Sequence, residues 1–286
     1  MTFPRLPLGD AVADAIDWLT DTFRPLFAVV KAVLVACYDA LDTVLSGPPF
    51  WVIGLLLVVL ALFAKGWRFA LVALVGLVLV VGVDQWDNAM DTLALVMLAS
   101  AVALAVGIPL GIWAARDDRV SAVVRPVLDL MQTMPAFVYL IPTVIVFLTG
   151  AVPGIVATVI FAIAPGVRFT ELGIRQVDRE VVEAGHAFGS APGRILRQVQ
   201  LPLAMPTIMA GVNQVIMLAL SMVVIAGMVG ADGLGRDVVA ALQRIDVALG
   251  FEAGLSVVIL AIYLDRVTSA FGARSAVARA LAAAEA

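Results

Sequence analysis

The chain has 286 residues, of which 63% are hydrophobic and 14% are charged, and its mean hydropathy is +1.07. A soluble domain is closer to half apolar and about a quarter charged, so we predict an integral membrane protein. The net charge of −4 argues against the basic surface of a nucleic-acid-binding protein. With one cysteine, Cys37, and one histidine, His186, the sequence excludes an intrachain disulfide framework and a cluster of His and Cys metal ligands.

The first predicted element is an amphipathic helix over the extracytoplasmic N-terminal segment 1–48. Apolar residues recur there at spacings of three and four, and charged residues follow the same rhythm on the opposite side of the helix. We expect this helix to lie on the outer membrane surface, with packing against the protein's own spans as the alternative. Pro25 should kink it or split it in two. Cys37 belongs to the apolar stripe and is expected to be inert.

Uncharged runs then predict the spans, because a helix needs about 20 apolar residues to cross a bilayer. Two peripheral transmembrane helices fall within 49–84, and five more fall within a core over 88–270. In that core the run 130–167 is long enough for two spans, and Gly150, Pro153 and Gly154 predict a tight turn between them. The expected fold class is all-α, a polytopic membrane protein with about seven transmembrane helices and a tail over 271–286. The runs are 43–64, 69–83, 92–115, 130–167, 203–228 and 247–264.

Basic residues predict the orientation, because Lys and Arg concentrate on the cytoplasmic side. If the 65–68 turn, the 116–125 loop, the 168–197 loop and the C-terminus are inside, most of the 18 basic residues are cytoplasmic. We therefore expect a multi-pass protein of a bacterial-type cytoplasmic (inner) membrane, with the N-terminus outside and the C-terminus inside.

The loop between the fifth and sixth spans, over 175–202, is the most informative segment. It is rich in charged and polar residues and predicts two short helices joined by a turn. Gly189 suits the turn and Pro192 the first turn of the second helix, while Pro202 marks the start of the next span. A short helix across the inner face of the membrane is suited to dock into a groove on a partner.

The spacing in this loop is Glu183-Ala184-Gly185, three residues, Gly189, nine residues, Val199, one residue, Leu201-Pro202. It resembles the signature loop of binding-protein-dependent ABC transporter permeases, Glu-Ala-Ala, three residues, Gly, nine residues, Ile, one residue, Leu-Pro. Gly185 and Val199 depart from that pattern by small changes. Further segments within about 85–270 look like the glycine betaine/proline (quaternary amine) uptake subfamily. They are 130–142, 200–214, 218–226 and 233–235.

The resemblance implies a type I ABC importer permease fold and a set of partners. We expect a second permease copy (a homodimer), two ATPase subunits, an extracytoplasmic substrate-binding protein and membrane lipids, and no nucleic acid. The sequence contains no Gly-x-x-x-x-Gly-Lys-Ser/Thr motif, so we expect no enzymatic activity and no cofactor in this chain, with ATP and Mg²⁺ on the partner ATPase. The residues expected to couple to the ATPase, beyond capping and turning the loop, are Glu183, Ala184, Gly185, Phe188, Gly189, Pro192, Val199, Leu201 and Pro202.

A second group of residues is a candidate for lining the transport pathway, with ordinary helix or lipid packing as the alternative. Prolines interrupt spans four and five, and breaks in spans often line pathways. The faces of aromatic rings attract a quaternary ammonium group, so they could line the path that such a group takes. The candidates are Pro135, Phe137, Tyr139, Pro142, Asn213 and Ser221. No metal site or catalytic residue is expected.

Four smaller features also carry expectations. Gly107 and Gly111 fit a small-xxx-small helix contact. Asp129 is expected to pair with Arg125, and Asp265 with Arg266 at the inner end of the last span. His186 should be solvated. Three glycines outside the membrane should form turns. They are Gly230, Gly233 and Gly235.

The leading function is therefore the permease of an ATP-driven importer for glycine betaine, proline or a related osmolyte. The alternatives are a permease for choline, carnitine or histidine, and an ion-coupled secondary transporter. The secondary transporter would need acids near the bilayer midplane, and the sequence places the charges at the ends of the spans. A scaffold is disfavoured by the 175–202 loop, and an intramembrane enzyme by the lack of paired carboxylates at depth.

Overall fold

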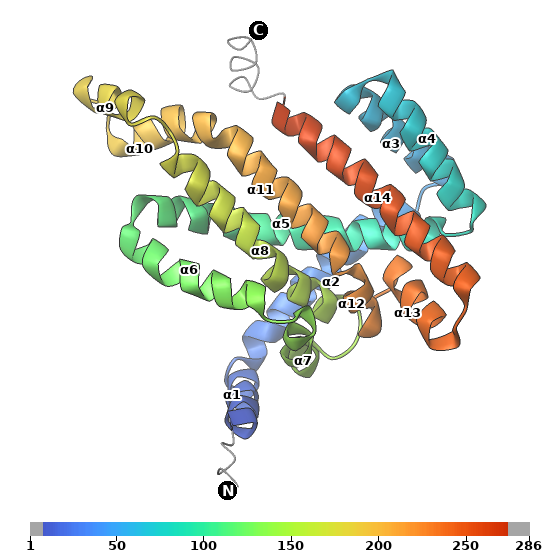
Figure 1. The fold of residues 1–286 in the computed structure, drawn as a ribbon. Coiled ribbons are helices and arrows are strands. Elements are labelled where there is room, and N and C mark those ends of the chain that lie inside the picture. Colours follow the sequence, from blue (N-terminus) through green and yellow to red (C-terminus); the bar gives the residue numbers. More distant parts are fainter. Residues whose placement is uncertain (1–7, 274–286) are drawn as a thin grey trace, which may run out of the picture.

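The computed structural model describes residues 8–273, and within that range the chain is helical with no β-strand (Figure 1). The first half contains α1 (Leu8–Thr22), α2 (Arg24–Ser46), α3 (Phe50–Lys65), α4 (Trp67–Gly82), α5 (Trp86–Arg116), α6 (Asp118–Thr133) and α7 (Ala136–Phe147). The second half contains α8 (Ala151–Arg175), α9 (Arg179–Ala187), α10 (Pro192–Ile195), the π-helical turn η1 (Leu196–Gln200), α11 (Leu201–Ser221), α12 (Val223–Met228), α13 (Leu234–Arg244) and α14 (Val247–Ala273). The predicted all-α class is confirmed, and the predicted tail lies outside the described residues from position 274.

Among the described residues, four helical stretches are long and apolar enough to cross a membrane alone: α5, α8, the run from α10 to α12, and α14. Two more apolar helices, α3 and α7, each follow another helix across a sharp bend, of 95° and 97° respectively. The seventh, α4, has only 16 residues. At about 1.5 Å per residue, α3 and α4 are each about 24 Å long, which is shorter than a hydrocarbon core of about 30 Å. The seven predicted spans thus each contain an apolar helix among the described residues, but these helices differ in length.

The centre of the bundle is formed by α5, α8 and α11, and close approach between α5 and α8 depends on two glycines. A Cβ atom added to Gly107 would lie 3.3 Å from the Ile163 side chain. One added to Gly111 would lie 2.6 Å from the backbone oxygen of Val167. The small-xxx-small contact predicted for this pair is confirmed, because the two backbones meet where side chains are absent.

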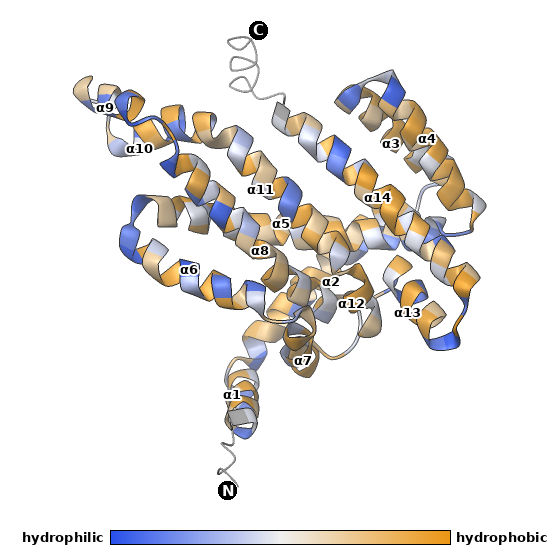
Figure 2. Cartoon of the chain, in the orientation of Figure 1, coloured by the Kyte–Doolittle hydropathy of each residue, from blue (hydrophilic) through white to orange (hydrophobic). Residues whose placement is uncertain are grey.

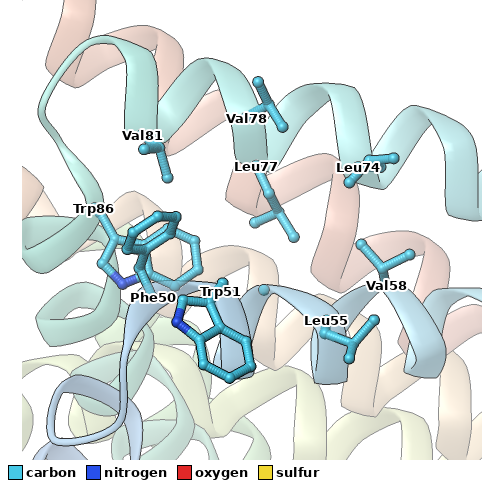
Figure 3. Close-up of a pocket in the computed structure, with 10 residues that line it drawn as sticks. Phe50, Trp51, Leu55, Val58, Leu74, Leu77, Val78, Val81 and Trp86 are labelled. Atoms are coloured by element: carbon cyan, nitrogen blue, oxygen red, sulfur yellow. The ribbon is translucent and has the colours of Figure 1, made fainter.

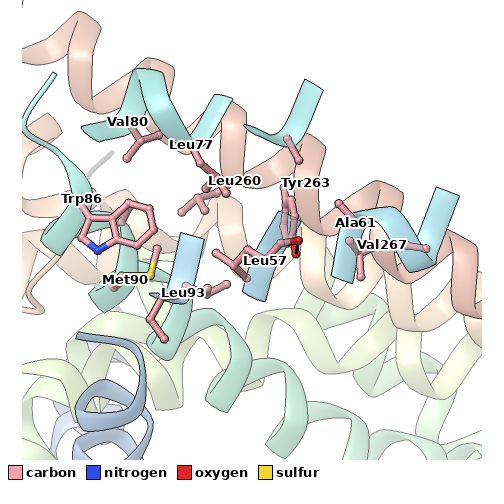
Figure 4. Close-up of a cluster of buried hydrophobic side chains, with 14 of the residues drawn as sticks. Leu57, Ala61, Leu77, Val80, Trp86, Met90, Leu93, Leu260, Tyr263 and Val267 are labelled. Carbon is pink, nitrogen blue, oxygen red and sulfur yellow. Dashed lines mark hydrogen bonds between the residues drawn. The ribbon is translucent and has the colours of Figure 1, made fainter. Parts of the chain in front are cut away.

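The peripheral helices α3 and α4 pack against α14 and the start of α5 through buried apolar side chains (Figure 4). Leu57 of α3, Leu77 of α4 and Leu260 of α14 are all at most 6% exposed. The Tyr263 hydroxyl donates to the backbone oxygen of Leu57 at 2.8 Å, so the buried phenol is satisfied. These contacts join the first two apolar helices to the core.

The predicted fourth span is preceded by a further helix, α6, which begins at Asp118. The chain leaves the helix at Met134 and Pro135 and continues as α7 after a bend of 97°. Proline disfavours the α conformation in the residue before it, and Met134 is extended, with ψ 138°. The charged first part, α6, was not expected to belong to the span because it is not apolar. It lies along α8, where the Gln132 side chain donates to the Phe161 backbone oxygen at 2.9 Å.

The predicted turn between spans four and five is also placed slightly differently. The helix is interrupted at Leu148, Thr149 and Gly150, and Gly150 has φ +120°. Pro153 and Gly154 lie in the first turn of α8, where a missing proline N–H costs nothing because that position has no helical acceptor. Of the three residues predicted for the turn, Gly150 lies in it, whereas Pro153 and Gly154 belong to α8.

The N-terminal segment is split near Pro25, as predicted, into α1 and α2. One face of α2 packs on the bundle, where Phe27 makes an edge-to-face contact with Phe147 at 5.9 Å and Leu34 is buried. The Lys31 ammonium donates to the Phe147 backbone oxygen at 3.0 Å, where α7 ends. For α2 these contacts agree with the predicted alternative, in which the helix packs against the protein's own spans. Cys37 lies on the exposed side of α2.

At the opposite end from the 175–202 loop, α12 and α13 form a cap over the start of α5. Asp237 of α13 accepts hydrogen bonds from Gln85 at 3.0 Å and Asn88 at 2.8 Å. Gly230 and Gly233 have φ of +89° and +107°, which fits the turns predicted for them. Gly235 instead begins α13, where a Cβ would lie 2.0 Å from the Val223 backbone oxygen. It is needed for close packing and is not a turn residue.

Candidate functional site

The first short helix of the 175–202 loop is closed at both ends by local hydrogen bonds. At its start, the Asp178 side chain accepts from the Glu180 backbone N–H at 2.9 Å. At its end, the Gly189 N–H donates to the His186 oxygen at 2.9 Å and the Ser190 N–H to the Gly185 oxygen at 3.1 Å. These two hydrogen bonds, together with the φ of +75° at Gly189, form a Schellman motif, in which glycine takes the left-handed position without strain. The turn predicted at this glycine is thus observed.

The second short helix is held to the first and to the bundle by two buried residues. Pro192 occupies the first turn of α10, as predicted. Ile195 is 2% exposed and Leu196 8% exposed, and Leu196 packs with residues of α8 and α11. A Cβ added to Gly185 would lie 3.2 Å from Cγ1 of Ile195. Glycine at this position, where the resembled pattern has alanine, therefore lets α9 and α10 approach closely.

The start of the next span is continuous with α10. Pro202 lies in the first turn of α11, as predicted, but helical structure already begins at Pro192 and leads through η1 into α11. Between α10 and α11 the chain makes a π-helical turn, and the Leu201 N–H donates to the Leu196 oxygen five residues back. Because Pro202 has no N–H and its ring crowds the preceding turn, the α-helical bonding cannot continue there. Val199 lies within this wider turn, and Leu201 opens α11.

The tip of the loop presents an aromatic side chain to its surroundings. Phe188, the residue that ends α9, is 90% exposed. Ala184 and Glu183 on the same helix are also exposed, as is His186, in agreement with its expected solvation. Figures 1 and 2 show α9 and α10 beyond the ends of α8 and α11, with a mixed polar and apolar surface. A largely exposed phenylalanine on a turn that is closed by hydrogen bonds is suited to fill a pocket on another protein.

Beneath the loop, a buried carboxylate joins three helices. Glu171 of α8 is 3% exposed and accepts from Ser121 of α6 at 2.7 Å and from Arg125 of α6 at 2.8 Å. Arg175 donates to the same carboxylate at 2.9 Å and to the Ala114 backbone oxygen of α5 at 2.8 Å. We call these residues, Ser121, Arg125, Glu171 and Arg175, the Glu171 cluster. It fixes the end of α8 from which α9 extends.

A small recess separates α9 from the bundle. It has a volume of about 200 Å³, and Arg175, Arg179, Val182 and Glu183 are among the residues that line it. Glu183 is thus an exposed residue that lies beside the recess between α9 and the end of α8.

The pairing predicted for Asp129 is wrong. Arg125 bonds to Glu171, and Asp129 of α6 forms its ion pair with Arg168 of α8. Because α6 lies along α8, the partner across the helix pair is closer to Asp129 than the residue one turn away on α6 itself. Asp265 does lie near Arg266, at 3.7 Å, and also accepts a hydrogen bond from Asn213 at 2.9 Å.

The six candidates for lining a pathway fall in different places. Tyr139 is buried among α7 and α8 residues, and its hydroxyl donates to the Met131 oxygen at 2.5 Å. Phe137 is 51% exposed on the same short helix, whose start and interior are marked by Pro135 and Pro142. Ser221 is exposed and bonds within α11. Asn213 lines a cavity of about 460 Å³ between α8, α11 and α14.

A different cavity, of about 490 Å³, lies between α3 and α4 near their junction with α5 (Figure 3). Its walls are apolar and aromatic, with Trp51 and Trp86 at one end and Val58 and Leu74 at the other. Such walls offer few partners to a charged or zwitterionic molecule, and burial without partners is costly. This cavity is therefore not a candidate for binding a polar substrate.

Comparison with known proteins gives consistent matches over most of the chain. Residues 107–278 match the family described as "Binding-protein-dependent transport system inner membrane component". The glycine betaine transport system permease protein OpuAB of Bacillus subtilis (strain 168) is 47% identical over 265 residues, which cover 93% of this chain and 94% of that protein. The glycine betaine/carnitine transport permease protein GbuB of Listeria monocytogenes serotype 1/2a is 48% identical over 276 residues, covering 95% and 98%.

Among solved structures, an inward-facing form of the MetNI methionine ABC transporter has the same fold. One of its chains superposes with a TM-score of 0.59 at 19% sequence identity, covering 64% of this chain and 91% of that chain.

Proposed function

Because the chain belongs to the family of binding-protein-dependent transport system inner membrane components, we propose that it forms the membrane pathway of an ATP-driven importer for glycine betaine. It is a transport permease of the inner membrane, and several of its helices are apolar enough to span that membrane. The substrate proposal is supported by the printed names of OpuAB and GbuB, which share almost half of their residues with this chain. Carnitine, named for GbuB, proline and related osmolytes are the alternatives.

We propose further that a partner ATPase supplies the energy for transport and binds this chain at the 175–202 loop. The supporting observation is the rigid pair of short helices with Phe188 at 90% exposure on their turn. A helix with an exposed aromatic anchor fits a groove on a partner protein. The Glu171 cluster ties this docking element to α8 and α6, so force applied at the loop reaches the membrane helices. ATP and Mg²⁺ would be bound by the ATPase.

The complete importer would contain two copies of this chain, two ATPase subunits and an extracytoplasmic binding protein. We place the N-terminus outside and the C-terminus inside, so that the 175–202 loop faces the ATPase in the cytoplasm. The supporting observation is the excess of basic residues on that side, which include Arg175, Arg179, Arg194 and Arg197 of the loop.

Affinity purification tests the docking proposal. The wild-type chain should recover an ATPase from membranes, and Phe188→Ala should recover at most about a tenth as much, because hot-spot aromatics commonly contribute 2 kcal/mol or more. Phe137→Ala is the matched control, since Phe137 is an exposed aromatic on α7, away from the loop. Equal recovery by wild type and Phe188→Ala would refute docking through this side chain.

The substrate is tested through the binding protein. If glycine betaine is the substrate, a binding protein that co-purifies with the permease should retain glycine betaine, detectable by mass spectrometry of the released ligand. Recovery of carnitine or choline instead would identify the alternative substrate, and recovery of a sugar or a peptide would contradict a quaternary amine importer.

A further inference from the structure

A chain of polar side chains connects α11 with α14 inside the membrane part of the bundle. The Asn213 amide nitrogen donates to Asp265 at 2.9 Å, and the Asn213 oxygen accepts from the Thr268 hydroxyl at 2.6 Å. The Ser269 hydroxyl donates to the Asp265 backbone oxygen at 2.6 Å. These four residues are partly buried, and both of the two helices that carry them are long enough to span a membrane.

The depth of this network follows from the packing of α11 on α8. Val215, two residues after Asn213, is fully buried against Ala162, which lies at the middle of α8 (Ala151–Arg175). On α14, Asp265 is 18 residues beyond Val247, or about 27 Å, beside a hydrocarbon core of about 30 Å. The network therefore lies in the inner part of the bundle, which agrees with the sequence-based placement of Asp265 toward the inner end of its span.

An ionisable group inside a membrane is costly and calls for a function. One carboxylate oxygen of Asp265 accepts from Asn213. The other lies 3.7 Å from Nε of Arg266, whose side chain is 57% exposed and can turn to solvent. Arg168 of α8 is paired with Asp129. The negative charge of Asp265 is thus only partly compensated by neighbouring groups.

The network borders the cavity of about 460 Å³ between α8, α11 and α14. Asn213 and Ser269, which both bond to Asp265, line it together with Gln214 and Phe169. Gln214 is exposed, and its side chain has no hydrogen-bond partner among the described residues. In contrast to the apolar cavity of Figure 3, this one combines an aromatic ring, amide donors and a nearby carboxylate.

We propose that this cavity is a transit site of the permease itself for a zwitterion with a quaternary ammonium group, an inference that rests on the proposed function. The Phe169 ring and the negative charge of Asp265 attract the cationic end. The Gln214 amide, which lines the cavity beyond Asn213, donates to the carboxylate end. The site is open and partly polar, so it holds the substrate weakly and releases it, while tight capture belongs to the binding protein.

Direct binding tests this site in the purified permease–ATPase complex without its binding protein. Saturation-transfer NMR compares the methyl signal of glycine betaine with that of 3,3-dimethylbutanoate, which has the same shape but no positive charge. The wild type should favour glycine betaine, and Asp265→Asn should lower that signal about tenfold without lowering the 3,3-dimethylbutanoate signal, because the anion is repelled by Asp265 and loses no attraction in the variant. Asp129→Asn, which removes a carboxylate from the α6–α8 pair, should behave as wild type.

A second variant, Phe169→Leu, keeps an apolar side chain against Gly211 and removes the aromatic face. It too should weaken the glycine betaine signal alone, and it serves as the test if Asp265→Asn does not fold. Equal signals for the two ligands in wild type, or unchanged signals in both variants, would overturn the proposal. If the wild-type importer takes up glycine betaine under ATP while these results are negative, the transit site alone fails. If the wild type takes up no quaternary amine, the proposed function fails.

Discussion

Gly189 and Gly193 lie four residues apart in the same loop but have different roles. Gly189 has φ +75° and closes α9, whereas Gly193 lies within α10, where an added Cβ would meet nothing within 4 Å. The left-handed conformation costs other residues about 1–2 kcal/mol. A side chain at Gly189 should therefore loosen the turn that presents Phe188, and one at Gly193 should not.

Two alanine substitutions test this difference. Gly189→Ala should lower substrate-stimulated ATPase activity of the assembled importer several-fold, because the strain of about 1 kcal/mol or more favours loop shapes that do not dock. Gly193→Ala should keep wild-type activity, since alanine favours the helix. If both variants retain full stimulation, the shape of the turn does not matter for coupling.

The residues of this loop could be predicted because they act locally. Gly189 and Pro192 determine the turn and the second helix through their own backbone preferences, and both lie where the sequence placed them. The partner of Asp129 could not be predicted in this way. Arg168 is 39 residues away, and the ion pair exists only because α6 lies along α8.

At the scale of elements, the pairing of α6 with α8 depends on Glu171. Its carboxylate is buried and bonded to Ser121, Arg125 and Arg175. The pair of Asp129 with Arg168 joins the same two helices but is largely exposed, at 65% and 43% of the side chains. Buried charged hydrogen bonds contribute more than exposed ion pairs, so the two carboxylates should differ in their effect on stability.

Isosteric amides measure that difference. Glu171→Gln should reduce the free energy of unfolding by about 1.5–3 kcal/mol, seen as a lower thermal midpoint in detergent. Asp129→Asn should change it by less than about 1 kcal/mol. A larger loss for Asp129→Asn than for Glu171→Gln would show that the Glu171 cluster does not hold α6 in place.

The elements also show where sequence reasoning ends. Apolar runs predicted all seven apolar helices, because burial in lipid requires them. They did not predict the helix α6 that precedes the fourth span, since Arg125 and Asp129 interrupt the apolar pattern. Those charges are tolerated because residues of α8 pair with them. The π-helical turn before Pro202 was missed for a related reason: Pro202 predicts a break in hydrogen bonding, but not its form.

For the whole molecule, the predicted orientation, with the N-terminus outside and the C-terminus inside, can be tested by cysteine labelling. The sequence contains one cysteine, so Cys37→Ser gives a background free of thiols. In that background, Asp246→Cys introduces a thiol between α13 and α14, and Gly193→Cys introduces one in the 175–202 loop; both positions are exposed. A membrane-impermeant maleimide should label Asp246→Cys in intact spheroplasts and Gly193→Cys only after lysis. The reverse pattern would place the N-terminus inside.

The central claim is that this chain is a pathway driven by a partner ATPase. The direct measurement is uptake of radiolabelled glycine betaine into liposomes that contain the chain, its ATPase and an external supply of the binding protein. We predict uptake that requires ATP at the ATPase side and the binding protein at the other, and that is lost in Phe188→Ala. Uptake by the chain alone, without ATP and without partners, would contradict the account.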